Sequence, residues 1–251
     1  MFYTLNCKNI KEFDIKEKKA MTWLLNILIP KLRKCIRNFP YKRWRFIKVI
    51  NLESNLPHTR ADCIVLPHWF MTKLLSYKKD KNIRDAIEDC GLTLIHEQTH
   101  IYQRLNRSIF NNLYKNYWNF ENPNKINNLN LLDRNRTNPD GLDIKWIYTK
   151  INNRYVLPIA IYSNYAVDLT DTDNVLIEII KINNVFQFTD RHFKMKNNDE
   201  YNSFFGNRNN YHPNEISALY FAEYFRECNN LGNVKLSEGY KQFKQWLNKL
   251  Q

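Results

Sequence analysis

The segment at 93–102, Thr-Leu-Ile-His-Glu-Gln-Thr-His-Ile-Tyr, constrains what this chain can fold into more than any other. Its two histidines, His96 and His100, are four residues apart in an apolar run, so a helix would project both imidazoles from one face. Two imidazoles in that arrangement can bind one metal ion, and the pattern predicts Zn²⁺. Glu97 would reach a water molecule on that ion and not the ion itself, so we expect it to act as a general base.

A helix whose two histidines only form hydrogen bonds inside a core is the structural alternative to a metal site. The surrounding residues fit a buried helix of either kind, because Leu94 and Ile101 are apolar and no proline interrupts the segment. Two buried imidazoles and a carboxylate would each need a polar partner, however. A shared metal ion supplies that partner, and the sequence therefore favours the metal site.

A zinc site that also binds water needs a third protein ligand, and we predict that this ligand is Glu215. Pro213 and Asn214 indicate a helix at 214–228, because proline is tolerated at a helix start and asparagine is a preferred cap. On that helix Glu215 would share a face with small and apolar side chains and would point inward. An inward carboxylate is costly without a partner, and a zinc ion would be that partner.

Other residues compete with Glu215 for the role of third ligand. They are Glu178, His192, Glu200 and His212. Glu178 lies in an apolar strand-like run, where alternation would turn it outward, and His192 and Glu200 lie in polar stretches. His212 is the strongest rival because imidazole suits zinc, but it precedes the predicted helix. We therefore expect His212 outside the ligand set, within reach of a substrate carbonyl or of a residue that supports the ligands.

The His-Glu-x-x-His motif at 96–100 resembles that of the zinc metallopeptidases with an HExxH active-site helix. Gln103 and Asn106 stand where the metzincin branch of these enzymes has a glycine and a third histidine, which excludes that branch. The run Asn-Glu-Ile-Ser-Ala at 214–218 resembles the second motif of the gluzincin branch, whose third ligand is a glutamate on a later helix. The resemblance covers these two short segments and implies a zincin-like α+β fold.

The resemblance also implies the role of each site residue in peptide hydrolysis. His96, His100 and Glu215 would hold the zinc ion, and Glu97 would take a proton from the attacking water. His212, Tyr211 and Tyr220 are close to the third ligand in sequence and are candidates to contact the substrate or its oxyanion. Several gluzincins have an aspartate where this chain has Leu219, so Glu223 or backbone carbonyls are expected to orient the histidines instead.

The hydrophobic pattern predicts one α+β domain over 1–251, in which a small β-sheet lies beside the HExxH helix. Helices are expected at 16–38, 68–77, 82–106, 108–120, 214–228 and 238–249, and strands at 45–51, 62–66, 143–150, 154–163, 174–182 and 184–190. The first of these helices belongs to a helical N-terminal extension at 1–40. One of the strands 45–51 and 62–66 resembles the edge strand with which HExxH peptidases pair their substrate. The C-terminal part of the chain is predicted to be helical.

The two zinc motifs are separated by a loop and β-rich insert at 122–195. Its loop is rich in Asn, Asp and Pro and contains Asn138-Pro-Asp140-Gly, which is a turn signal on local grounds. Loops of this length near a site are often functional. Asn138 and Asp140 are therefore candidates for substrate binding, with a purely local turn as the alternative.

The chain has 38 Lys and Arg against 25 acidic residues, and its net charge of +13 favours polyanionic partners. The basic residues at 31–45 could form a binding patch or a solvated face. The second functional hypothesis is accordingly a basic, nucleic-acid-associated or structural protein in which zinc only braces the fold. Glu97 favours the peptidase, because a structural zinc site needs no base.

Cysteine usage and apolar run length predict where the chain works. Its 5 cysteines are scattered and include no CxxC pair, which favours a reducing, intracellular compartment. No apolar run reaches the ~18 residues that a transmembrane helix needs, and no signal peptide is evident. The abundance of Asn, Lys and Ile with only 5 Gly is typical of an AT-rich genome, such as that of a virus or microbe.

Overall fold

The computed structural model describes residues 7–40, 43–51, 55–123, 126–127, 135–136, 145–151, 154–163, 166, 171–208, 210–234 and 236–250. The α-helices are α1 (Ile15–Cys35), α2 (His68–Lys79), α3 (Ile83–Asp85), α4 (Leu92–Leu105), α5 (Arg107–Asn112), α6 (Asp199–Phe205), α7 (Pro213–Cys228) and α8 (Glu238–Leu250). Among the described residues, two π-helical stretches, Ala86–Gly91 and Leu113–Tyr117, and two short 3₁₀ turns, Cys7–Asn9 and Met195–Asn197, complete the helical part.

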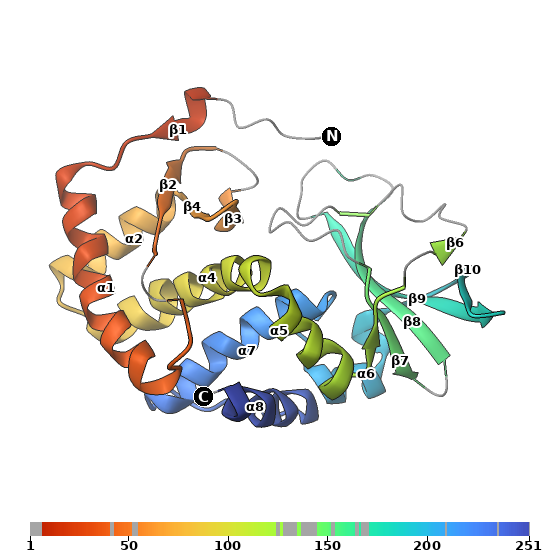
Figure 1. The fold of residues 1–251 in the computed structure, drawn as a ribbon. Helices are drawn as coiled ribbons and strands as arrows, with labels where there is room; N and C mark the ends of the chain where they lie inside the picture. Colours follow the sequence, from red (N-terminus) through yellow and green to blue (C-terminus); the bar gives the residue numbers. More distant parts are fainter. Residues whose placement is uncertain are drawn as a thin grey trace.

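The described strands form two sheets (Figure 1). They are β1 (Ile10–Lys11), β2 (Phe46–Val49), β3 (His58–Arg60), β4 (Cys63–Pro67), β5 (Phe120–Glu121), β6 (Ile126–Asn127), β7 (Ile147–Ile151), β8 (Arg154–Tyr162), β9 (Thr172–Ile182) and β10 (Val185–Lys194). The smaller sheet has the order β1-β2-β4-β3 and lies beside α4. The larger sheet has the order β5-β7-β8-β9-β10-β6 and lies on the opposite side of the molecule from α1. The chain is therefore a mixed α+β protein.

Helix α1 begins at a capping box. Asp14 accepts from the Glu17 amide at 2.8 Å, and Glu17 accepts from the Asp14 amide at 2.8 Å, so two amides at the helix start are satisfied. Pro30 lies inside α1, and the helix continues beyond it to Cys35. Pro30 is exposed, and the buried apolar face on the other side of the helix offsets its missing hydrogen bond.

The small sheet is held against α4 by Arg104. Its guanidinium donates to the Ala61 carbonyl, at the turn between β3 and β4, over 2.7 Å and 3.1 Å. The predicted strands 45–51 and 62–66 correspond to β2 and β4, and both are interior strands of the sheet. The expectation that one of them is an edge strand is therefore wrong, because each already has a neighbouring strand on both sides.

The predicted helix at 82–106 is a composite of α3, the π-helical stretch Ala86–Gly91 and α4. Gly91 lies where the π-helical stretch meets α4, and a Cβ there would be 3.2 Å from Cδ1 of Leu28 on α1. The close neighbour of Gly91 on another helix is therefore a side chain of α1.

One apolar cluster joins the helices to the larger sheet. It contains core residues of α1, α4, α7 and α8 and, from the sheet, Tyr148, Val156 and Leu176. Helix α6, which was not predicted from the sequence, packs Tyr201 and Phe205 into this cluster. A second, smaller cluster lies on strands β7 to β10 and includes Leu157 and Ile177. Within the described residues no helix has the length and apolar character required to cross a bilayer.

Candidate metal centre

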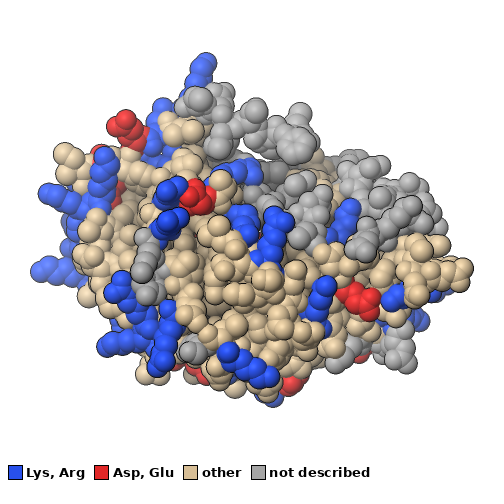
Figure 2. Space-filling view, viewed as in Figure 1, with Lys and Arg blue, Asp and Glu red and all other residues tan. Residues whose placement is uncertain are grey.

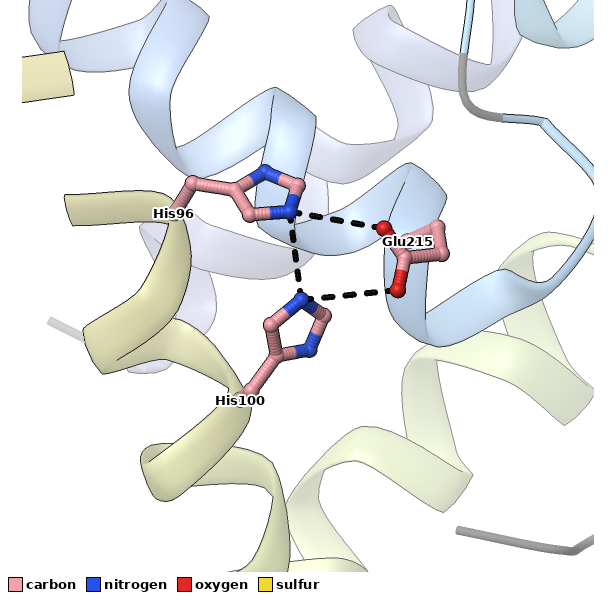
Figure 3. Close-up of side chains that lie close together, drawn as sticks. All are labelled: His96, His100 and Glu215. Atoms are coloured by element: carbon pink, nitrogen blue, oxygen red, sulfur yellow. Dashed lines mark hydrogen bonds and ion pairs between the residues drawn. The ribbon is translucent and has the colours of Figure 1, made fainter. Parts of the chain in front are cut away.

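Helices α4 and α7 bring the side chains of His96, His100 and Glu215 together (Figure 3). The Nε2 atoms of His96 and His100 are 3.1 Å apart. Glu215 Oε2 is 3.4 Å from Nε2 of His96, and Glu215 Oε1 is 3.5 Å from Nε2 of His100. Among the described residues, these three form the group of His, Cys, Asp and Glu side chains that is close enough to share a metal ion.

The three side chains differ in their exposure to solvent. His100 and Glu215 have 1% and 6% of their side-chain surface exposed, whereas His96 has 17%. The cluster is therefore buried on the side of His100 and accessible on the side of His96. Glu97, beside His96 on α4, is also nearly buried at 5% exposed.

Gln103 determines which nitrogen of His100 carries the proton. The Gln103 Nε2 group is 2.8 Å from the Asn214 carbonyl, which can only accept, so this end of the side chain is the NH₂ group. Its Oε1 is therefore the atom 3.0 Å from His100 Nδ1, and an amide oxygen can only accept. Neutral His100 must accordingly carry its proton on Nδ1 and present a lone pair at Nε2.

The lone pair on Nε2 of His100 indicates whether the cluster fits a metal ion. This lone pair faces a carboxylate oxygen of Glu215 and the Nε2 atom of His96. A lone pair and a carboxylate repel each other unless a positive charge lies between them, and burial strengthens that repulsion. Two imidazoles and one carboxylate are a ligand set that Zn²⁺ accepts in catalytic sites, with one position left for water. The residues present therefore fit a zinc ion.

Gln103 is a site residue that the sequence interpretation missed. It is 2% exposed and lies three residues after His100, on the same side of α4. The signal available in the sequence was a long amide on a helix face where its polar atoms would need buried partners. For His100 the orienting partner is Gln103, whereas Glu223, one of the expected sources of orientation, forms an ion pair with Arg226 at 3.1 Å.

A buried hydroxyl extends the contacts of Gln103 across α7. Ser217 Oγ accepts from Gln103 Nε2 at 2.9 Å and donates to the Asn214 carbonyl at 3.1 Å. The Tyr114 hydroxyl lies 2.9 Å from the same oxygen, and burial raises the pKa of this tyrosine well above its ordinary value. These bonds connect the HExxH helix, the first turn of α7 and the π-helical stretch Leu113–Tyr117.

His212 is the N-cap of α7. Its Nδ1 accepts from the Asn214 amide at 3.1 Å, with Pro213 in the first turn. Asn214, which we expected to be the cap, is instead inside the helix. Because a backbone amide can only donate, neutral His212 carries its proton on Nε2. Nε2 of His212 is therefore a hydrogen-bond donor at the N-terminal end of α7, the helix that also carries Glu215.

Tyr220 does not face the cluster. It is five residues after Glu215, or about 140° round the helix. Its buried hydroxyl donates to the Phe205 carbonyl at 3.0 Å and lies 2.9 Å from Ser237 Oγ, so its role as a substrate contact is corrected to a structural one. Tyr211 is half-buried and packs against the main apolar cluster.

The rival ligands lie elsewhere in the described chain. Glu178 was expected to point outward, but it is 8% exposed and pairs with Arg154 at 3.2 Å. His192 and Glu200 are exposed. Asn138 and Asp140, the loop residues predicted to bind substrate, lie outside the described residues.

Comparison with known proteins identifies no relative of this chain. No family model, curated protein or solved structure matches the chain. The chemistry of the centre therefore has to be argued from its own residues.

Proposed function

We propose that this chain is a zinc-dependent peptidase of gluzincin type, with a zincin-like fold. The observation that carries the proposal is the convergence of His96, His100 and Glu215 from two helices, with Glu97 beside the first histidine. The small sheet beside α4 and the later helix that supplies the carboxylate support a zincin-like arrangement. The lone pair of His100, directed at a carboxylate, supports a cation at this point.

Each residue of the site would have one task in peptide hydrolysis. Zinc bound by the three ligands would lower the pKa of a water molecule from ~15.7 towards ~7. Glu97 would accept the proton of the attacking water and deliver it to the leaving amine. His212 would donate from Nε2 to the developing oxyanion, because the cap hydrogen bond of its Nδ1 leaves the proton on Nε2.

The same ligand set also occurs in non-haem Fe(II) oxygenases, which use two histidines and one carboxylate. Glu97 favours hydrolysis over oxygen chemistry, because a buried carboxylate next to a ligand is what activation of water requires. The metal that copurifies with the protein distinguishes the two classes.

The decisive experiment combines metal analysis with a proteolysis assay. We expect about one zinc per chain by elemental analysis and cleavage of a protein or mixed-peptide substrate that a chelator stops and zinc restores. The matched control is Glu97→Gln, which should bind the same amount of zinc and cleave nothing. Purified wild-type protein that binds no zinc under zinc-replete conditions would contradict the proposal.

A second candidate function is binding to a nucleic acid, and the exposed face of α1 favours it. This basic face consists of Lys16, Lys18, Lys19, Arg33, Lys34 and, just beyond the end of the helix, Arg37. The one acidic residue of α1, Glu17, is buried and accepts from Lys48 at 2.7 Å, so it does not offset the charge of this face. Figure 2 shows Lys and Arg gathered on the side of the molecule where α1 lies.

Binding of labelled single-stranded and duplex DNA over a series of salt concentrations tests this second candidate. We expect the affinity to fall as salt rises, because binding would release counterions. Replacing Arg33, Lys34 and Arg37 by glutamate should reduce the slope of log Kd against log salt by about 0.9 for each phosphate that the protein no longer neutralises. Weak binding that does not depend on salt would exclude a nucleic-acid partner.

A further inference from the structure

The side-chain amide of Gln103 is in contact with both helices of the metal centre. Its Oε1 lies 3.0 Å from Nδ1 of His100 on its own helix, α4. Its Nε2 donates to the Asn214 carbonyl at 2.8 Å and to Ser217 Oγ at 2.9 Å, both on α7. These contacts use the acceptor and the donor end of one buried side chain.

Only one orientation of this amide satisfies its surroundings. Turning it by 180° would place Oε1 against the Asn214 carbonyl and the NH₂ group against Nδ1 of His100. Oε1 and the Asn214 carbonyl, two acceptors, would then face each other in a buried site, and the NH₂ group could donate to Nδ1 only if the imidazole proton moved to Nε2. An unsatisfied polar group at such a depth is costly, so the position of α7 and the tautomer of His100 depend on each other.

The hydrogen bonds to Asn214 also fix the position of Glu215 relative to α4. Asn214 immediately precedes Glu215, and its carbonyl accepts from both Gln103 and Ser217. A shift of α7 along α4 would therefore move the Glu215 carboxylate and at the same time break the hydrogen bond between Gln103 and the Asn214 carbonyl. Leu219, an apolar residue one turn after Glu215, cannot provide a polar contact of this kind.

We propose that Gln103 is the positioning residue of the metal centre, which sets the ligating nitrogen of His100 and holds the first turn of α7, with Glu215, against α4. The inference rests on the proposed zinc site and attributes part of the zinc affinity of that site to Gln103. Zinc binding and docking of the two helices are coupled at this single amide. Ser217 takes part only in the docking, because its hydroxyl contacts Gln103, Tyr114 and the Asn214 carbonyl but neither histidine.

Three variants separate the two tasks, with zinc alone as the ligand in a chelator competition assay. Gln103→Leu removes both sets of hydrogen bonds and should weaken zinc binding about 10–100-fold, as loss of a supporting partner does elsewhere. Gln103→Glu keeps an oxygen for the Nδ1 proton of His100 but sets a second oxygen against the Asn214 carbonyl, so it should bind zinc more tightly than Gln103→Leu and more weakly than wild type. Ser217→Ala removes only a docking contact and should lower the Tm by about 2–4 °C with unchanged zinc affinity.

A spectroscopic measurement on the zinc-loaded wild-type protein avoids any dependence on the folding of a variant. Nitrogen NMR of the imidazole should show His100 protonated at Nδ1 and bound to zinc through Nε2. An Nε2-protonated His100, or zinc affinity of Gln103→Leu within threefold of wild type, would overturn the inference. Equal loss of zinc affinity in Ser217→Ala and Gln103→Leu would also overturn it, because the effect would then be general destabilisation. Failure of wild type to bind zinc is a different outcome, which contradicts the proposed function.

Discussion

His212 caps the helix on which Glu215 stands, three residues further along the chain. The cap is a hydrogen bond of 3.1 Å from the Asn214 amide to Nδ1 of His212, whereas the Glu215 carboxylate lies within 3.5 Å of both histidines of α4. Two potential zinc ligands that are neighbours in sequence therefore have different contacts. Nδ1 of His212 accepts the cap hydrogen bond at the start of α7, whereas the Glu215 carboxylate faces His96 and His100.

Substitution of these two residues should separate their roles. We expect Glu215→Ala to lose stoichiometric zinc, because it removes one of three ligands. His212→Ala should retain zinc and lose about 1 kcal/mol of unfolding free energy with the cap. Elemental analysis and thermal unfolding of both variants measure the two effects. Zinc retained in Glu215→Ala and absent in His212→Ala would mean that the site has three histidines and is not of gluzincin type.

Glu97→Gln should remove hydrolysis while leaving the fold and the metal in place. The amide is nearly the same size as the carboxylate but cannot accept the proton of the attacking water, so the rate should fall by at least about 100-fold. His96→Ala is the matched comparison, because it removes a ligand and should lose zinc as well as activity. Equal loss of zinc in the two variants would contradict the assigned roles.

The stability of the protein should fall in acid because of Asp89. Burial alone raises the pKa of this carboxyl, but hydrogen bonds from Lys73 and Tyr77 more than offset burial and hold it below its ordinary value. A carboxyl with a depressed folded-state pKa stabilises the fold above its unfolded value, about 3.9, and this contribution disappears as the pH falls through the folded-state pKa.

Unfolding of wild type and Asp89→Asn at a series of pH values checks this expectation. The variant should be less stable at pH 7 by at most about 1 kcal/mol, because the pair is substantially exposed and screened. The difference should shrink towards zero as the pH falls through the folded-state pKa of the Asp89 carboxyl. A difference that stays constant with pH would mean that the effect of Asp89 is not electrostatic.

Leu28 and Gly91 are a large and a small residue in contact, so substitutions at the two positions should have non-additive effects on the free energy of unfolding. Gly91→Leu would overpack the junction of α1 and the HExxH helix and should destabilise the protein by about 1–3 kcal/mol. Leu28→Ala should cost about 2–5 kcal/mol through the cavity it leaves. In the double variant the new side chain can fill that cavity, so its cost should be smaller than the sum of the two. Additive costs in urea unfolding would show that the two sites are independent.

The sequence alone determined the elements that have strong local signals. Histidines four residues apart in an apolar run predicted a helix with both imidazoles on one face, and α4 has that arrangement. The β-branched runs of the insert predicted the strands β7 to β10 within a few residues, because alternation and turn residues are local properties. The choice of Glu215 came from a predicted helix start, an inward face and the resemblance of 214–218 to the gluzincin second motif, and its carboxylate lies in the cluster.

Contacts between distant segments were decided only by the tertiary structure. The pairing of β2 with both β1 and β4, which makes it an interior strand, depends on residues up to about 40 positions away. The contact of Gly91 with a side chain of α1, and the contact of Gln103 with the backbone of α7, have no signature in either segment alone. Periodicity and capping report how a segment folds, because they arise from interactions within a few residues of the chain. Which polar atom of one helix meets which carbonyl of another depends on how both pack, and the tautomer of His100 follows from that packing.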